Sequence, residues 1–441
     1  MLRALAKRLE AQELIAAALI AVAAPAAPAA AQTPPAAAVT ADPALGRQVE
    51  ALIPVLAGQP GYDTLFTAAF RQAVPPGQWE PLIRQLRDAL GAPRAVATLT
   101  PLTRWTANAT IAYERGSATM LVAIDPAAPH AIAGLRITGT ALADDTPAKL
   151  SADLAALPGT VRLGLYALDA GGPRPILAMQ DGAAAPLGSA FKLWVLAEAA
   201  RQVAAGTHRW DEVVPVGTPS LPSGILQSWP RATPVTLQTL ATLMMAISDN
   251  TATDTLIAIL GRDKVDAMAA RFGGSGPVLT TREAFVLKID PALTAAWAKG
   301  DAAARRALLA AQATRIAGAA IDPLMFSSGP VANDSVEWFA APRDMARLLA
   351  HLRDAGPVVR GILAVNHGVD PQTVARFAYV GFKGGSEPGV IALNLLAQTP
   401  DGRWYAVCAN WHRVDAGVDE ARFVALVTRA LALVATPATR P

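Results

Sequence analysis

The feature that most constrains the fold is a long helical stretch with strand-forming segments on both sides of it. Two apolar runs, Val161–Leu168 and Ile176–Gln180, surround a glycine-rich turn at 170–173 and predict a β-hairpin. Helical apolar spacing begins at Ser189 and continues to Leu352. Three more strand patterns and a closing amphipathic helix come last: Ala378–Lys383, Val390–Ala397, Trp404–Ala409 and Val418–Val434. This order implies one antiparallel sheet that is built from distant segments and layered by helices.

The first part of the chain has the opposite order, helices and then strands. Three segments with helical apolar spacing come first: Leu45–Leu56, Thr64–Ala73 and Gln78–Leu90. Four segments with alternating apolar residues follow: Ala95–Thr100, Trp105–Tyr113, Ala118–Ile124 and Ala131–Ile137. We predict a compact α+β domain over residues 44–143, which acts as a scaffold or binding module because it holds no cluster of carboxylates, histidines or cysteines. The polar stretch Ala143–Asp153 is the best candidate for a linker, and the second domain is expected over residues 155–437.

Residues 1–31 have the order of a secretory signal. Three basic residues precede an apolar run, and a stretch of small residues ends at Ala31. An uncleaved membrane anchor is the weaker alternative, because the run is short and prolines interrupt it. We expect a secreted or periplasmic protein that is not stably inserted in a membrane after processing. The Pro/Ala-rich residues 32–43 predict a disordered lead-in.

Composition narrows the classes of function. The 441 residues include 38 Lys and Arg against 35 Asp and Glu, with the basic residues scattered, and 52% of the chain is hydrophobic. This balance excludes a disordered chain and argues against a nucleic-acid partner. The five histidines lack metal-ligand spacing, and the single Cys408 excludes an internal disulfide and a cysteine-based zinc site. We expect a globular protein that acts on a small molecule without a metal or cofactor.

Ser189 and Lys192 are the first residues that indicate chemistry. They lie one helical turn apart at the start of a predicted helix, so their side chains share a face. A serine hydroxyl becomes a good nucleophile only when a base removes its proton. A lysine among apolar neighbours such as Phe191 and Trp194 can lose its charge and supply that base. Taken alone, this spacing is weak evidence, because a helix-capping serine gives the same pattern.

Two further motifs strengthen the indication. Ser248-Asp249-Asn250 lies in a loop between two helical runs, and Lys383-Gly384-Gly385-Ser386 ends a strand. Small residues after the lysine would let a substrate lie against the strand edge. The order Ser-x-x-Lys, Ser-Asp-Asn and Lys-[Thr/Ser]-Gly is typical of class A β-lactamases and penicillin-binding proteins.

Residues 155–437 thus resemble class A β-lactamase-like serine hydrolases, a family within the penicillin-binding protein and serine β-lactamase superfamily. With the front domain, and with motifs such as Leu221–Leu226 and Thr281–Phe285, the chain resembles the two-domain serine hydrolases typified by the open-reading-frame-12 product of the clavulanic acid cluster. The resemblance implies an α+β fold in which a cone-shaped domain, of the steroid-isomerase or cystatin kind, precedes a β-lactamase/transpeptidase-like domain.

The resemblance also implies roles for the motif residues. Ser189 would be the acylated nucleophile, Lys192 its base, and Ser248 the hydroxyl that passes a proton to the leaving nitrogen. Lys383 would face a substrate carboxylate and polarise Ser248. The expected substrate-binding positions are Asn250, Gly384, Gly385 and Ser386, and the backbone N–H groups of Ser189 and Ser386 would form the oxyanion hole.

The sequence departs from the class A pattern in two places. The third motif reads Lys-Gly-Gly, so Gly384 lacks a substrate-facing hydroxyl, for which Ser386 could compensate. Counting back from Pro342 puts the place of the deacylating glutamate near residues 321–326, where Asp322 is the only carboxylate. Glu337 is too close to Pro342 in the sequence to occupy that place. Asp322 is more often a turn residue than a base in such a context. We therefore expect complete acylation machinery and slow deacylation.

Two alternatives to a β-lactamase remain open. The first is a penicillin-binding D-Ala-D-Ala peptidase, and the second is a non-catalytic protein that uses the same fold to bind or sense a ligand. A covalent adduct on Ser189 would distinguish the enzymes from the binding protein.

Overall fold

The computed structural model describes residues 40–143, 145–322 and 329–435. The secretory signal and most of the lead-in, predicted at 1–31 and 32–43, therefore lie outside the described residues. Among the described residues, no helix is both long enough and apolar enough to cross a bilayer.

The first folded region, Pro43 to Leu142, packs helices on one four-stranded antiparallel sheet. Its strands follow one another in the order β1-β2-β3-β4. Alternate residues of β2 are buried, as expected for a sheet with one face on a core. The elements are α2 (Pro43–Leu56), α3 (Tyr62–Leu65), α4 (Ala68–Ala73), α5 (Pro76–Leu90), β1 (Pro93–Pro101), β2 (Thr106–Tyr113), β3 (Gly116–Ile124) and β4 (Ile132–Leu142). The assignment of this region to a cone-shaped family remains a prediction.

The single helix predicted over Thr64–Ala73 is wrong, because the chain breaks it in two. Phe66 adopts an extended conformation at the end of α3, and the Thr67 side chain then caps α4 by accepting a hydrogen bond from the Phe70 N–H at 3.2 Å. Helical apolar spacing continues across the break, so periodicity alone did not reveal it.

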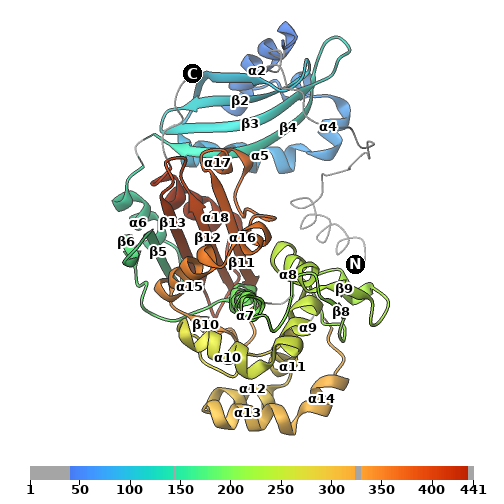
Figure 1. The fold of residues 1–441 in the computed structure, drawn as a ribbon. Helices are drawn as coiled ribbons and strands as arrows, with labels where there is room; N and C mark the ends of the chain where they lie inside the picture. Colours follow the sequence, from blue (N-terminus) through green and yellow to red (C-terminus); the bar gives the residue numbers. More distant parts are fainter. Residues whose placement is uncertain (1–39, 144, 323–328, 436–441) are drawn as a thin grey trace, which may run out of the picture. The chain divides into compact units, whose positions relative to one another are not determined.

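The second region is built on a five-stranded antiparallel sheet in the order β11-β12-β13-β5-β6. Strands from the start of the region (teal) lie beside strands from the end of the chain (red), as Figure 1 shows. Strand β13 pairs with β5, for example Val407 with Leu165. The strands are β5 (Thr160–Asp169), β6 (Gly172–Met179), β11 (Tyr379–Glu387), β12 (Val390–Gln398) and β13 (Trp404–His412). The predicted α+β class, with an antiparallel sheet layered by helices, is confirmed.

Apolar clusters cover both faces of this sheet. On one face Ile391, Leu393 and Leu395 of β12 pack with α6 and α18, and on the other Ala392 and Leu396 join the cluster that contains α7 and α15. The helices of the region are α6 (Pro147–Ala155), η1 (Gly188–Phe191), α7 (Lys192–Ala204), η2 (Leu226–Ser228), α8 (Leu237–Ala246), α9 (Asn250–Leu260), α10 (Arg262–Arg271), α11 (Thr281–Ile289), α12 (Pro291–Lys299), α13 (Ala302–Ala311), α14 (Ala313–Gly318), α15 (Pro342–Asp354), α16 (Pro357–Leu363), α17 (Pro371–Val374) and α18 (Glu420–Ala432).

Short two-stranded ladders complete the region. β7 (Ala185–Pro186) pairs with β10 (Phe339–Ala340), and β8 (Val213–Pro215) pairs with β9 (Pro234–Thr236). The first of these ladders is important for the site, because β7 leads directly into η1.

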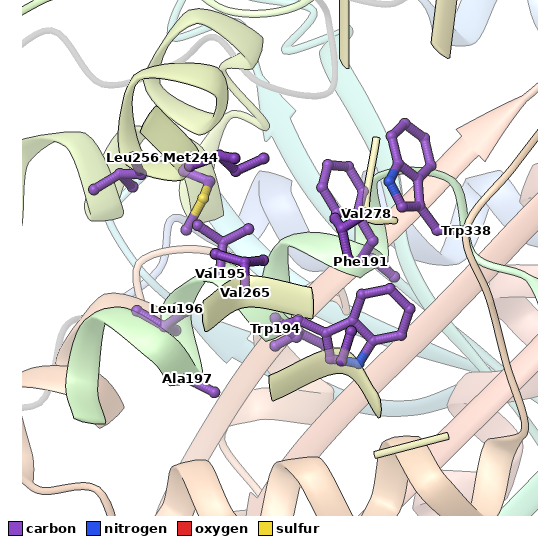
Figure 2. Packing of buried hydrophobic residues seen from close by; sticks show 14 of the residues in the cluster. Phe191, Trp194, Val195, Leu196, Ala197, Met244, Leu256, Val265, Val278 and Trp338 are labelled. Carbon is purple, nitrogen blue, oxygen red and sulfur yellow. The ribbon is translucent and has the colours of Figure 1, made fainter. Parts of the chain in front are cut away.

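Helix α7 runs through the larger apolar cluster and is buried along most of its length. Figure 2 shows Trp194, Val195 and Leu196 of this helix among side chains from the surrounding helices. Just before it, the ring of Phe191 stacks on Trp338 at a centroid distance of 3.9 Å. These contacts fix the orientation of the turn that carries Ser189.

The linker predicted over Ala143–Asp153 is wrong in its second half, which forms α6. Leu150 and Leu154 of this helix are buried in the cluster with α18. The polar residues of the stretch include acids that pair with Arg429 of α18, and this pairing explains why the segment looked like a solvated linker.

Candidate active site

Ser189 lies in the 3-10 turn η1 and is half-buried. The α-helix begins three residues later, at Lys192, rather than at Ser189 as the sequence suggested. Gly188 has a positive φ of 48°, and its N–H donates to the Glu337 carboxylate at 2.9 Å. Because the first N–H groups of a helical turn lack partners within it, this turn can present backbone donors to a ligand.

Lys192 is completely buried and uses three acceptors. Its Nζ lies 2.6 Å from the Ser248 carbonyl oxygen, 2.9 Å from Ser248 Oγ and 2.7 Å from Asn250 Oδ1. A protonated lysine can donate to all three of these oxygens. A neutral lysine can donate to the carbonyl and the amide oxygen and accept the proton of the Ser248 hydroxyl.

Ser248 is held in the left-handed region of backbone conformation, with φ of 59°. Its carbonyl oxygen accepts hydrogen bonds from Lys192 and, at 2.8 Å, from the Ser223 hydroxyl. A residue with a side chain adopts this conformation at a cost of about 1–2 kcal/mol, so the surrounding contacts must maintain it. Such strain is concentrated at functional sites in proteins.

Asp249 and Asn250 fix the loop that carries Ser248. The buried Asp249 carboxylate caps α9 by accepting from Ala252 N at 2.8 Å, and it also accepts from Ile225 N at 2.7 Å. The Asn250 amide donates to Leu221 O at 3.1 Å and its oxygen accepts from Lys192. These hydrogen bonds fix the orientation of the Asp249 carboxylate and of the Asn250 amide.

Lys383 approaches the same hydroxyl from β11. Its Nζ lies 3.2 Å from Ser248 Oγ and 2.6 Å from Gly384 O, and the residue is buried. Lys192 and Lys383 thus both contact the same serine hydroxyl. Burial lowers the pKa of Lys383 to about 7.

The pKa of Lys192 lies well below its ordinary value. Burial is the largest cause, and the neighbouring charge of Lys383 acts in the same direction. Asp254 and Asp249 partly oppose this shift because their carboxylates favour the charged amine. A lysine with a depressed pKa can act as a proton acceptor near neutral pH.

Gly385 brings β11 against the serine turn. A Cβ at this position would lie 2.2 Å from Leu187 O and 2.4 Å from Ser189 N, which no side chain could accommodate. A Cβ on Gly188 would lie 3.2 Å from Ser386 N. The backbone of Ser189 and the backbone of Ser386 are therefore neighbours, and Ser386 itself is exposed.

The structure brings all eight sequence-predicted site residues into one place, through these hydrogen bonds and backbone contacts. Their catalytic roles remain predictions. Gly384 and Ser386 alternate with Gly385 along β11, so they share the opposite face of the strand. The Ser386 side chain is hydrogen-bonded to Glu420 of α18, and its substitution for the hydroxyl missing at Gly384 stays a prediction.

Sequence reasoning missed Asp254, a carboxylate that faces Lys192. It accepts hydrogen bonds from Thr281 N at 2.7 Å, Thr281 Oγ1 at 2.8 Å and Arg282 N at 3.1 Å, and so ties α9 to the start of α11. Burial raises its pKa. Its position four residues after Asn250 on a helix was a usable signal, because such residues share a face.

The carboxylates weighed for deacylation have different settings. Asp322 is exposed at the end of a described segment, and residues 323–326 lie outside the described residues. Glu337 is buried, but its carboxylate is occupied by the N–H groups of Gly188 and Trp338 and by Lys288. In the described part of the chain, no group of three or more His, Cys, Asp or Glu side chains could hold a metal ion.

Comparisons with known proteins agree with this geometry. Residues 147–361 match the model of the beta-lactamase enzyme family. The matched segment includes Ser189, Lys192, Ser248 and Asn250 and ends before Lys383. No curated protein matches the chain.

Three solved structures illustrate the similarity of this chain to known proteins. A β-lactamase from Sphaerobacter thermophilus DSM 20745 is 21% identical, with 67% of this chain and 100% of that chain covered and a TM-score of 0.47. PBP-A is 17% identical, with 65% and 93% covered and a TM-score of 0.44. A β-lactamase from Chitinophaga pinensis DSM 2588 is 17% identical, with 66% and 98% covered and a TM-score of 0.43.

The family match, the three motifs and the sheet layered by helices lead to the same assignment. Residues 147–361 are thus similar to the beta-lactamase enzyme family, and they lie in a region whose antiparallel sheet is layered by helices.

Proposed function

We propose that the protein is a secreted serine hydrolase of the class A β-lactamase type, which opens a β-lactam or a related ester or amide through an acyl-enzyme on Ser189. The observation that carries this proposal is the hydrogen-bond network of Lys192, Ser248, Asn250 and Lys383 beside the serine turn. Export rests on the composition of residues 1–31 alone.

Acylation starts with neutral Lys192. It takes the proton of the Ser189 hydroxyl, and the serine oxygen attacks the carbonyl carbon of the substrate. The negative charge that develops on the carbonyl oxygen is met by the N–H groups of Ser189 and Ser386. The short separation of these two backbone segments supports such a pair of donors.

The leaving nitrogen needs a proton, and Ser248 is suited to deliver it. Its hydroxyl lies within hydrogen-bonding distance of both Lys192 and Lys383. Ser248 gives its proton to the nitrogen while Lys192, protonated in the first step, restores it. Lys383 stabilises negative charge on Ser248 and attracts a substrate carboxylate.

Deacylation is proposed to be slow. The carboxylate of Glu337, beside the serine turn, is occupied by Gly188, Trp338 and Lys288, and residues 321–326, where a class A glutamate is expected, contain no glutamate. An acyl-enzyme that lacks a dedicated base is expected to accumulate.

A D-Ala-D-Ala peptidase is the second candidate. The same Ser, Lys, Ser and Asn arrangement serves acyl transfer from a peptide, and slow hydrolysis of a lactam is typical of such enzymes. A peptide ending in D-Ala-D-Ala tests this candidate directly: release of D-alanine at a rate above that of lactam turnover would favour it.

Burst kinetics with a chromogenic cephalosporin test the proposed function. We expect a burst of product equal in amount to the enzyme, followed by slow turnover. The Ser189→Ala variant should give neither phase, whereas Ser151→Ala, which removes a half-buried hydroxyl on α6, should behave like the wild type. A burst that survives in Ser189→Ala would contradict the proposal.

A further inference from the structure

A buried group of three ionisable side chains lies behind the serine turn. Lys288 of α11 places its Nζ 3.1 Å from Glu337 Oε1 and also contacts Glu387 Oε2. The side chains of Lys288 and Glu337 are 2% and 1% exposed, and that of Glu387 is 16% exposed. Buried charges are unfavourable unless they are paired, so a retained group of three requires an explanation.

Each carboxylate of this group is attached to one side of the proposed oxyanion hole. Glu337 Oε2 accepts the N–H of Gly188 at 2.9 Å, and Gly188 directly precedes Ser189. Glu387 directly follows Ser386 at the end of β11. Lys288 therefore connects, through two carboxylates, the two backbone segments whose N–H groups would bind the oxyanion.

The geometry of β11 places Glu387 on the correct face for this link. Side chains alternate along a strand, so Lys383, Gly385 and Glu387 share one face. Gly385 on that face packs against the serine turn with no room for a Cβ. Because glycines form this contact, the two segments meet there through backbone atoms and no side chain ties one segment to the other.

We propose that Lys288 is a positioning residue of the oxyanion hole, which through Glu337 and Glu387 fixes the distance between the N–H groups of Ser189 and Ser386. The proposal rests on the proposed acyl transfer at Ser189. It assigns a role to three residues that lie outside the three sequence motifs.

The charge state of the group also matters. Burial and the neighbouring Glu337 raise the pKa of Glu387 to about 8, and the two carboxylates keep Lys288 protonated by raising its pKa despite burial. Above about pH 8, ionised Glu387 adds a negative charge behind the oxyanion. His412 of β13 is another titratable group near Glu337, and Glu420 of α18 hydrogen-bonds Ser386, the neighbour of Glu387.

The first test compares acylation rates of the full chain by stopped-flow with the chromogenic cephalosporin. Lys288→Met should acylate about 10–100-fold more slowly, since a displacement of about 1 Å at a site of this kind can cost about 100-fold. Glu337→Gln should have a similar effect, because its amide oxygen can still accept from Gly188 while its NH₂ group no longer pairs with Lys288. This second variant keeps the test valid if Lys288→Met does not fold.

Two controls separate positioning from stability. Glu283→Gln lies on α11, the helix of Lys288, and weakens an ion pair to Arg262 of α10. Lys264→Met removes an exposed lysine. Neither substitution should change the acylation rate. Glu387→Gln removes the negative charge that Glu387 gains above about pH 8, so the acylation rate of this variant should not fall over that pH range as that of the wild type does.

The infrared carbonyl stretch of the trapped acyl-enzyme provides a readout that folding alone would not change. We expect a higher frequency in Lys288→Met than in the wild type, because weaker hydrogen bonds polarise the ester carbonyl less. A wild-type rate and an unchanged stretch in both Lys288→Met and Glu337→Gln would overturn the positioning role. Failure of the wild type itself to acylate would instead overturn the proposed function.

Discussion

At the scale of single residues, Ser248 combines a backbone in the left-handed region with contacts to both buried lysines of the site. Its φ of 59° turns the hydroxyl toward both lysines, and its carbonyl oxygen anchors Lys192. Conformational strain of this kind trades stability for function.

This trade can be measured with two substitutions. Ser248→Gly relieves the strain, since glycine adopts positive φ freely, whereas Ser248→Ala keeps it. We expect Ser248→Gly to be more stable than Ser248→Ala by about 1 kcal/mol in urea unfolding, with both variants deficient in acylation. Equal stability of the two would mean that the conformation of Ser248 is not strained.

The two buried lysines predict opposite effects of pH. Acylation needs neutral Lys192, so its rate should fall as the pH drops and the amine becomes protonated. Substrate attraction needs charged Lys383, whose pKa of about 7 means that the charge is lost as the pH rises through 7. The KM of a lactam that bears a carboxylate should therefore rise above about pH 7, while that of a neutral ester should not. A KM with the same pH dependence for both substrates would contradict the role of Lys383.

At the scale of elements, the contact between η1 and β11 determines whether the site can form. The sequence predicted both elements and their motifs, and it predicted that Gly384 departs from the family pattern. The sequence did not show why residue 385, the next one along the strand, is also a glycine. That reason is the approach of the Gly385 backbone to Leu187 and Ser189, which appears only when distant segments meet.

A pair of alanine substitutions tests this contact. Gly385→Ala forces a methyl group against Ser189 N, so we expect about 100-fold slower acylation and a loss of about 1–3 kcal/mol in stability. In Gly384→Ala the methyl group first meets the far end of the Phe382 ring, at 2.6 Å, and this ring can rotate away. The matched variant should keep most of its stability. Similar losses in both variants would show that the close approach is not specific to Gly385.

At the scale of the whole molecule, the second region is closed by elements from its two ends. Strand β5 pairs with β13, and α6 packs with α18 in the same apolar cluster. Arg429 of α18 completes this closure, since its guanidinium binds both oxygens of Asp145 at 2.7 Å and Asp153 at 2.7 Å.

The sequence could not predict this closure because the partners of Asp145 and Asp153 lie more than 270 residues away. Local patterning gave the strands, the helices and the motif residues, for which nearby residues carry the signal. Asp254 could have been noticed from its spacing to Asn250, whereas Lys288 and Arg429 depend on contacts between distant segments, for which the local pattern contains no information.

Substitution of Arg429 tests the closure. Arg429→Met leaves two partly buried carboxylates without their partner, so we expect the free energy of unfolding to fall by about 2–3 kcal/mol. The matched variant Arg422→Met, which removes an exposed arginine from the same helix, should change it by less than about 0.5 kcal/mol. Thermal or urea unfolding of both variants measures the difference. Equal stabilities would show that Arg429 contributes no more than a surface charge.

The central claim is that Ser189 becomes covalently acylated, and an intact-mass time course with a penicillin tests it most directly. We predict that the protein gains the mass of one penicillin, that the adduct decays slowly, and that Ser189→Ala gains nothing. Peptide mapping of the adduct should place it on the peptide that contains Ser189. The absence of any adduct on the wild-type protein, or an adduct that persists in Ser189→Ala, would contradict the account.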